Sequence, residues 1–239
     1  MERPVIRCDT CAVRHRAVCG ALSRDEIDQI NSIARHRTVP PGHRIIGTED
    51  KITSFSNIIS GVVKLSKTLS DGRQQILGLQ FASDFIGRPF RVSSPYDAEA
   101  VTDVHLCSYD RSQFERLVTQ YPDLQHRLFE HTLDELDAAQ EWMVLLGRKS
   151  AEEKVASLVL MISRRLDAVG CKPKSAAEAF KFEMPLTRAE IADFLGLTIE
   201  TVSRQFSRLK TAKIISLEGS KIIHIIDPER LEQCCEQSE

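Results

Sequence analysis

The spacing of apolar residues divides the chain into a region of short strands followed by a mainly helical region. Between residues 38 and 110, runs of branched and aromatic residues recur at roughly ten-residue spacing, with turn signals such as Ser60-Gly61 between them. The runs are Ile45-Ile46, Ile58-Ile59, Val62–Leu65, Ile76–Phe81 and Val104–Cys107. Strands of this length and spacing predict a small β-roll, a double-stranded, jelly-roll-like barrel.

A helical pattern precedes these strands. Residues 21–37 carry Ser23 and, three positions later, Glu26, and an apolar face begins with Ile27 and Ile30. Serine followed by glutamate at this spacing is a capping box, in which each side chain accepts a hydrogen bond from the other residue's backbone N–H. The pattern predicts a helix that begins just after Ser23.

The longest helical pattern covers residues 111–146 and is interrupted only by Pro122 near its start. Six of its residues are spaced alternately three and four apart: Phe129, Thr132, Leu136, Ala139, Met143 and Leu146. This is the a/d seam of a two-helix coiled coil. Because a single helix with such a seam needs a partner, we expect a symmetric homodimer. The alternative is that the seam packs on the chain's own β domain.

The C-terminal part, residues 148–239, predicts two short helices joined by a tight turn. Thr187 begins a capping box ahead of a helix Arg188–Leu195, and Gly196 ends that helix. Thr198 then caps a second helix. A pair of helices joined in this way is a helix-turn-helix.

A hairpin is predicted after the helix pair. The apolar runs Ile214–Leu217 and Lys221–Ile225 flank a glycine turn. Ser150 and Glu153 form a further capping box, which predicts another helix ahead of the pair. We therefore expect an α+β protein whose last domain is a winged helix-turn-helix.

The second helix of the pair has a basic surface. Residues 198–213 carry four cations and one glutamate, a local charge of +3. Glu200, Ser203 and Arg204 share a face in its N-terminal half, the part of a recognition helix that meets base edges. Other residues are better placed for phosphates: Thr187, Thr198, Thr201, Arg208 and Lys213. We therefore expect binding to double-stranded DNA, and a basic, solvated helix is the alternative.

Overall composition is ordinary and conceals this local charge. The chain has 239 residues, of which 42% are hydrophobic and 28% charged, with a net charge of -2. This balance argues against a wholly basic nucleic-acid coat and a polybasic membrane binder. No apolar run reaches about 18 residues, and Met1–Cys11 lacks the apolar core of a signal peptide. We expect a cytoplasmic protein with no membrane partner.

The seven cysteines suggest metal or redox chemistry, because an odd number does not fit a secreted disulfide framework. Cys8, Cys11 and Cys19 have the spacing C-x2-C-x7-C, and Cys107 lies at the end of a predicted strand. From spacing alone, these four thiols fit a zinc ion nearly as well as an iron–sulfur cluster. The other cysteines are not expected to be ligands: Cys171, Cys234 and Cys235. The last two are expected near an exposed terminus.

Catalytic motifs are missing from the sequence. It contains no recognisable nucleophile–base pair, no phosphate-binding glycine loop and no H-E-x-x-H zinc site, so we do not expect an enzyme. A pure interaction module is a further alternative. The recognition face from Glu200 to Arg204 argues against it.

The order of these parts resembles the CRP/FNR family of bacterial transcription regulators over nearly the whole chain. The resemblance is strongest over residues 186–208, which begin LTRAEIADFLGLTIETVSR. Glu200, Ser203 and Arg204 match the Glu-x-x-Ser-Arg pattern of the FNR branch, whereas the CRP branch has glycine in place of Ser203. The resemblance implies a palindrome with TTGAT and ATCAA half-sites, in which Arg204 binds the guanine, Ser203 a thymine and Glu200 the inner base pair.

The resemblance also indicates an effector. Oxygen-sensing FNR-like proteins hold a 4Fe–4S cluster with three N-terminal cysteines and one from the β domain, which here implies Cys8, Cys11, Cys19 and Cys107. The x7 gap is similar to that of the alphaproteobacterial FnrN and FnrL types. The stretch Ser83–Arg91 lacks the Gly-Glu step and the Arg-Ser pair of cyclic-nucleotide binders, so no cyclic nucleotide is expected. Zinc, haem or direct thiol oxidation are the alternative inputs.

The resemblance finally implies four domains and further partners. The domains are a cysteine-rich arm (1–20), a β-roll sensor domain (21–110), a dimerisation helix (111–147) and the winged helix-turn-helix (148–239). RNA polymerase is the expected partner, through the Ser70–Arg73 turn and the Asp84–Ser94 loop. Several cluster-gated relatives have an acid in the dimer seam where this chain has Ala139, so we expect a dimer that depends less on the cluster.

Overall fold

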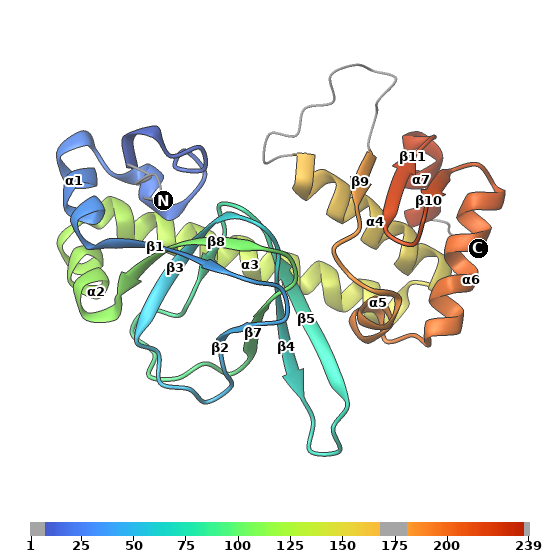
Figure 1. Ribbon diagram of the computed structural model, residues 1–239, viewed down its shortest axis with the longest axis horizontal. Coiled ribbons are helices and arrows are strands. Elements are labelled where there is room, and N and C mark those ends of the chain that lie inside the picture. Colours follow the sequence, from blue (N-terminus) through green and yellow to red (C-terminus); the bar gives the residue numbers. More distant parts are fainter. Residues whose placement is uncertain (1–7, 168–180, 237–239) are drawn as a thin grey trace. The chain divides into compact units, whose positions relative to one another are not determined.

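The computed structural model describes residues 8–167 and 181–236 (Figure 1). The chain divides into two compact units. The first comprises Met1–Gly72 and Leu77–Ala138, and the second comprises Arg73–Ile76 and Ala139–Glu239. No helix among the described residues is long and apolar enough to cross a membrane.

Two four-stranded sheets lie in the described part of the first unit, except that residues 74–76 of their last strand belong to the second unit. The first sheet has the order β1-β8-β3-β6, with bounds Ala34–Val39, Val104–Asp110, Ser54–Ser60 and Phe85–Ile86. The second has the order β2-β7-β4-β5, with bounds Arg44–Ile46, Asp97–Ala100, Val63–Thr68 and Gln74–Gln80. Neighbouring pairs such as β1–β8, β3–β8 and β4–β7 are antiparallel. The predicted β-roll is therefore confirmed.

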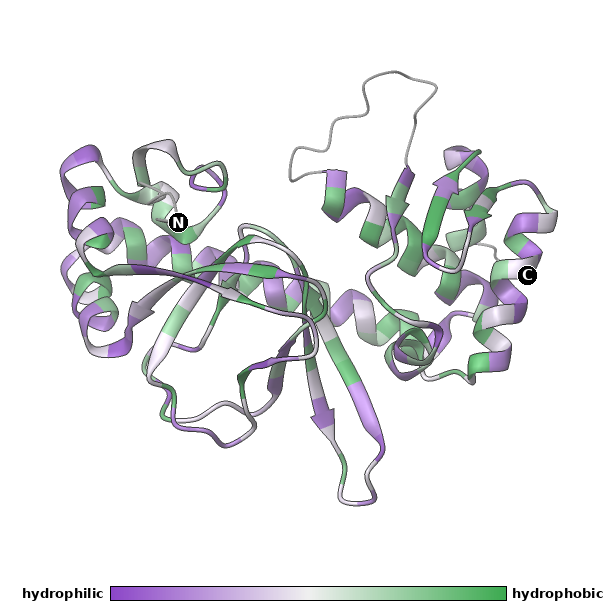
Figure 2. Cartoon of the chain, viewed as in Figure 1, coloured by the Kyte–Doolittle hydropathy of each residue, from purple (hydrophilic) through white to green (hydrophobic). Residues whose placement is uncertain are grey.

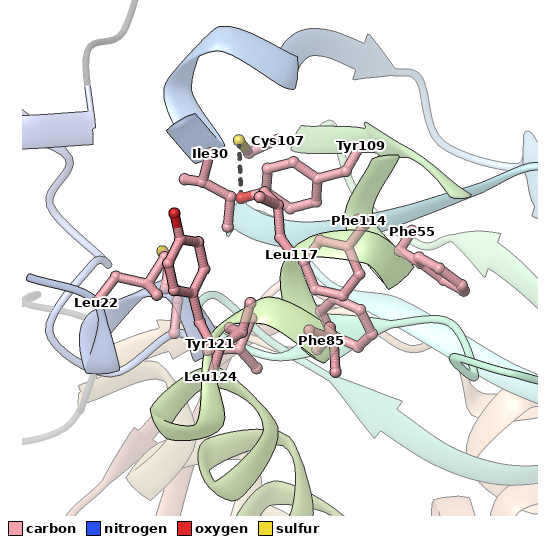
Figure 3. Packing of buried hydrophobic residues seen from close by; sticks show 14 of the residues in the cluster. Leu22, Ile30, Phe55, Phe85, Cys107, Tyr109, Phe114, Leu117, Tyr121 and Leu124 are labelled. Carbon is pink, nitrogen blue, oxygen red and sulfur yellow. Dashed lines mark hydrogen bonds between the residues drawn. The ribbon is translucent and has the colours of Figure 1, made fainter. Parts of the chain in front are cut away.

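The alternation of side chains along β8 separates two apolar clusters. Val104 and Leu106 lie in a core with residues of both sheets, including Ile58 on β3 and Ala98 on β7. Cys107 and Tyr109 point to the other face and pack with the N-terminal segment and the helices, as Figure 3 shows. Because successive side chains of a strand point to opposite faces, β8 contributes to both clusters.

The N-terminal segment and first helix cover that second face. The segment contains two short 3₁₀ helices, η1 (Cys8–Thr10) and η2 (Val18–Ala21), and is followed by α1 (Arg24–Ile33). The predicted capping box is confirmed, because the Ser23 N–H donates to Glu26 Oε2 at 2.8 Å and the Glu26 N–H donates to Ser23 Oγ at 3.4 Å. The helical region 21–37 was predicted too long, since β1 begins at Ala34.

Pro122 separates two helices within the long helical pattern. α2 spans Arg111–Gln120 and α3 spans Pro122–Arg148. Tyr121 between them has an extended backbone, and proline then takes the start of α3, where its missing N–H costs nothing. The structure thus divides a pattern that the sequence suggested was nearly continuous.

Among the described residues, the second unit contains the end of α3, four further helices and a small sheet. The helices are α4 (Ala151–Asp167), α5 (Arg188–Leu195), α6 (Ile199–Thr211) and α7 (Pro228–Cys235). The sheet has the order β10-β11-β9, with bounds Ile215–Glu218, Ile222–Ile225 and Lys181–Glu183. Figure 2 shows hydrophobic residues on α4 and β11, in the interior of this unit. The predicted winged helix-turn-helix is confirmed.

The structure corrects the prediction for the C-terminal cysteines. Cys234 and Cys235 are each only 6% exposed, because α7, which the sequence did not predict, presents them to the core of the second unit. The two side chains are therefore buried, although Glu236, which follows them, is exposed. Cys171 lies outside the described residues.

The capping box of α4 provides a stability prediction. The Ser150 N–H donates to Glu153 Oε2 at 2.6 Å and the Glu153 N–H donates to Ser150 Oγ at 3.4 Å. We expect Ser150→Ala to lower the free energy of unfolding by about 1 kcal/mol, measured by urea denaturation. Ser220→Ala, in the exposed β10–β11 turn, is the control and should change it little. An equal loss in both variants would contradict the capping role.

The same box has an expected pH dependence. The Ser150 N–H lowers the pKa of Glu153 from its ordinary value of 4.5. A lowered pKa in the folded state stabilises the protein above the unfolded pKa, and this contribution is lost as the pH falls through the folded pKa. The difference in the free energy of unfolding between wild type and Glu153→Gln, which has no titrating carboxyl at this position, should therefore shrink on acidification below about pH 4.5.

Candidate cluster pocket and recognition helix

Four thiols from two distant parts of the first unit meet at one pocket. Cys8, Cys11 and Cys19 come from the N-terminal segment, and Cys107 comes from β8. The other lining residues are Val13, Ala17, His36, Asn57, Ile59 and Tyr109. The four cysteines predicted as ligands thus lie together, whereas Cys234 and Cys235 lie in the second unit.

Apolar packing and hydrogen bonds hold the cysteine-bearing segment on the sheet. Ala17 and Val18, next to Cys19, are almost completely buried in the cluster that includes Cys107. The Cys8 N–H donates to Asn31 Oδ1 of α1 at 3.4 Å. Arg127 of α3 donates to a main-chain oxygen of the segment at 3.2 Å. The segment is therefore positioned by contacts with α1, α3 and β8.

Cys107 occupies the middle of β8, which corrects the expectation of a strand end. The strand continues through Ser108 and Tyr109 to Asp110 because it pairs on both sides. In that pairing Cys107 lies opposite His36 of β1 and Asn57 of β3. A thiol at this place is fixed by two neighbouring strands.

Burial and mutual repulsion disfavour thiolates in this pocket. The pKa of Cys19 is raised to about 12, first by burial and then by the neighbouring Cys107, Cys11 and Cys8. Burial is also the main reason why the pKa of Cys107 is raised to about 12. Four adjacent thiolates therefore need a cationic group to compensate their charge, and binding such a group would release protons.

Two buried polar residues of the pocket are not predicted by the sequence. Asn57 and Tyr109 are 2% and 1% exposed; the Asn57 amide donates to Cys19 Sγ, and Tyr109 Oη accepts from Cys107 Sγ. Figure 3 shows Tyr109 beside Cys107, two residues away on the same face of β8. The sequence could have indicated Tyr109, because a residue two positions after Cys107 on the same strand points to the same face. Asn57 could not be predicted in this way, because its position depends on the register of β3 against β8.

The donor set suits an iron–sulfur group chemically. Four cysteine sulfurs and mainly apolar walls are the usual surroundings of such a group. Within the described ranges, no three His, Cys, Asp or Glu side chains are arranged to hold a single metal ion.

The second helix of the pair, α6, begins where its sequence predicts, directly after Thr198. Gly196 ends α5 in the left-handed conformation, with φ of 63°, which glycine adopts without strain. Thr198 caps α6, and its side chain accepts from the Thr201 N–H at 3.2 Å. Val202, Phe206 and other apolar residues of α6 are buried, so its opposite face is left to solvent.

The predicted base-contacting residues lie on that exposed face. Glu200, Ser203 and Arg204 are all exposed, and Arg204 donates to Thr201 Oγ1 at 3.4 Å. The Glu200 N–H and the Thr198 side chain lower the pKa of Glu200. This carboxylate is therefore ionised at neutral pH.

Some of the predicted phosphate-contacting residues already contact other side chains of the protein, whereas others are exposed. Arg208 forms an ion pair with Glu152 of α4 at 3.6 Å. Thr187 uses its hydroxyl in the capping box with Glu190, and Lys213 is exposed just after α6. Arg188, not among the predicted contacts, stacks on Phe206 at 3.3 Å, and its burial lowers its pKa to about 10.

Comparison with known families defines the class of the two units. Residues 36–121 match the cyclic nucleotide-binding domain, and residues 153–234 match the Crp-like helix-turn-helix domain. Together these two domains define a DNA-binding transcription regulator of the Crp type.

Similarity to individual proteins shows to which family within this class the chain belongs. The chain is 46% identical over 228 residues to a "Probable transcriptional activator" of Rhizobium leguminosarum bv. viciae, covering 95% of this chain and 92% of that one. It is 44% identical over 232 residues to "Transcriptional activator protein FnrL" of Cereibacter sphaeroides, covering 96% and 93%. The structure of FixK2 from Bradyrhizobium japonicum matches with a TM-score of 0.76 and 30% identity, over 87% of this chain and 100% of that one. The chain belongs to the Crp/FNR family, and its similar relatives are FNR-type and FixK-type activators.

Proposed function

We propose that the protein is a cytoplasmic transcription regulator of the anaerobic or microaerobic response, which senses oxygen through a 4Fe–4S cluster. The observation that carries this proposal is the meeting of Cys8, Cys11, Cys19 and Cys107 at one pocket. The cluster, when bound, supplies an oxygen-labile prosthetic group between the N-terminal segment and the sheet. Its loss would release the segment's cysteines from β8.

The residues around Arg88 argue against a cyclic nucleotide as the effector. Glu135, whose side chain is 53% exposed, lies near Asp84, Arg88 and His131, and the Gln80 amide donates to it at 3.2 Å. Two carboxylates beside the arginine would repel a cyclic phosphate.

The DNA-binding part of the proposal assigns the exposed face of α6 to the major groove. Arg204 would bind guanine bidentately, Ser203 a thymine, and Glu200 the inner base pair of TTGAT and ATCAA half-sites. Thr187, Thr198, Thr201, Arg208 and Lys213 would lie at phosphates and fix the register. Arg208 would have to exchange its Glu152 partner for a phosphate.

Exposure along α3 supports the proposed dimer. Phe129, Leu136 and Met143 are 60%, 50% and 66% exposed, which is unusual for large apolar side chains. The other members of the proposed seam are Thr132, Ala139 and Leu146, the last of them half-buried. A second copy packed along this seam would cover these side chains and pair two recognition helices on a palindrome.

Ala139 in the proposed seam bears on the oligomeric state of the protein without its cluster. An alanine in the seam adds no charge repulsion between two copies, so we expect the apo protein to remain partly dimeric. Sedimentation at micromolar concentration should show both monomer and dimer. Ala139→Asp should shift the apo protein to monomer, and a fully monomeric wild type would contradict the prediction.

An anaerobic spectrum tests the proposed function directly. The protein purified without oxygen should be coloured and contain iron and acid-labile sulfide. Its visible absorbance should decay in air while its affinity for the TTGAT/ATCAA palindrome falls. Zinc without acid-labile sulfide would overturn the proposal in favour of a zinc-stabilised regulator, and a haem spectrum would favour a haem sensor.

RNA polymerase is the further proposed partner. Its recruitment is expected through Ser70–Arg73 and Asp84–Ser94.

A further inference from the structure

A short chain of hydrogen bonds links two of the four thiols through the sheet. Asn57 Nδ2 lies 3.8 Å from Cys19 Sγ and donates to Tyr109 Oη at 3.0 Å. Cys107 Sγ lies 3.3 Å from the same Tyr109 oxygen. One amide of β3 is therefore connected to a sulfur of the N-terminal segment and to a sulfur of β8.

The orientation of this amide suits a thiolate better than a thiol. Its N–H groups are directed to Cys19 and Tyr109, while Asn57 Oδ1 is buried and has no hydrogen-bond partner among the described residues. An unpaired buried carbonyl destabilises the folded protein. The arrangement becomes favourable when the sulfurs carry negative charge, because N–H donors to charged acceptors are stronger.

We propose that Asn57 is a positioning residue that stabilises a bound iron–sulfur cluster against oxidation, an inference that rests on the proposed function. It donates to the Cys19 sulfur directly and to the Cys107 sulfur through the Tyr109 hydroxyl. Once Cys107 is deprotonated, the Tyr109 O–H can donate to that sulfur while its oxygen still accepts from Asn57. Donors to ligand sulfurs favour the more electron-rich state of a cluster, so their loss makes oxidation easier.

The two strands provide a matched control. Ser56 and Ser108 face each other one position along the same register and share a buried hydrogen bond of 2.8 Å. Because neighbouring residues of a strand alternate, this pair lies on the face away from the cysteines. Ser56→Ala removes a buried hydrogen bond between β3 and β8 without touching the pocket.

The test compares full-length wild type, Asn57→Leu, Tyr109→Phe and Ser56→Ala, each reconstituted with iron and sulfide under anaerobic conditions. For Asn57→Leu and Tyr109→Phe we expect the half-life of the visible absorbance in air to shorten by about two- to tenfold, the effect of one hydrogen bond. The Fe–S(Cys) stretching frequency in resonance Raman spectra should rise. Ser56→Ala should match wild type in both measurements.

A purely structural role would give a different result. Replacing Asn57 by leucine removes the unpaired carbonyl, so the apo variant should unfold at the same urea concentration as wild type or a higher one. An unchanged half-life in Asn57→Leu, or an equal shortening in Ser56→Ala, would overturn the inference. If Asn57→Leu does not load a cluster, an unchanged half-life in Tyr109→Phe overturns it. A wild type without acid-labile sulfide overturns the proposed function itself, which distinguishes the two failures.

Discussion

Cys107→Ser, purified without oxygen, should contain less than about a tenth of the iron and sulfide of wild type. Losing a residue that merely supports a ligand typically costs 10- to 100-fold in metal affinity, and losing a ligand should cost at least as much. Cys107 lies in the middle of β8 with a paired strand on each side, so the position of its side chain is fixed. The measurement is iron and acid-labile sulfide per chain together with the anaerobic absorbance spectrum.

The matched control for this variant is Cys234→Ser. Cys234 is as buried as Cys107, each being 6% exposed, but it belongs to α7 of the second unit. Its replacement should leave iron and sulfide content unchanged even where it lowers stability. Equal loss of iron in the two variants would show that folding, and not ligation, is being measured. Full iron content in Cys107→Ser would remove Cys107 from the proposed ligand set.

Arg204→Ala should weaken binding to the TTGAT/ATCAA palindrome by at least about thirtyfold. A bidentate arginine–guanine contact contributes roughly 1–3 kcal/mol of discrimination, and a dimer makes two such contacts. The loss should be largest for the intact palindrome and small for a site in which the guanine is replaced. Fluorescence anisotropy with both duplexes, at one fixed salt concentration, measures the difference.

Lys210→Ala is the control for charge. It lies exposed on the same helix and carries the same charge, but it is not among the residues proposed to contact bases or phosphates. We expect a small loss of affinity that is nearly equal for the two duplexes. If Arg204→Ala behaves in the same way, Arg204 contributes only its charge and the proposed guanine contact is wrong.

Local signals account for most of what the sequence could predict. The capping residues Ser23, Ser150, Thr187 and Thr198 act within three residues, so the helices they begin were found at the right place. Strand β1 was missed because of its sequence, ARHRTV, in which only Val39 is buried. Its pairing with β8, far along the chain, decides its structure.

In the candidate site, too, residues with local sequence signals could be predicted, and those placed by long-range packing could not. The spacing of Cys8, Cys11 and Cys19 is local, and together with the resemblance it identified the cysteines that line one pocket. Asn57 could not be found in this way, because only the register that places it opposite Cys107 brings it to the pocket. The burial of Cys234 and Cys235 was likewise missed, since it depends on α7 packing in the second unit.

The position of Cys107 on β8 has a mechanical consequence for the first unit. With the proposed ligands, a bound group would tie Cys19 to a thiol about 90 residues further along and close a loop that contains most of the β-roll. By analogy with a disulfide, closing a loop of this length stabilises the folded chain by about 4–5 kcal/mol through the entropy of the unfolded state. Oxygen would then act on the unfolding equilibrium of the sensor as well as on its DNA affinity. The cell could therefore lower the amount of the regulator in air through proteolysis of the loosened chain.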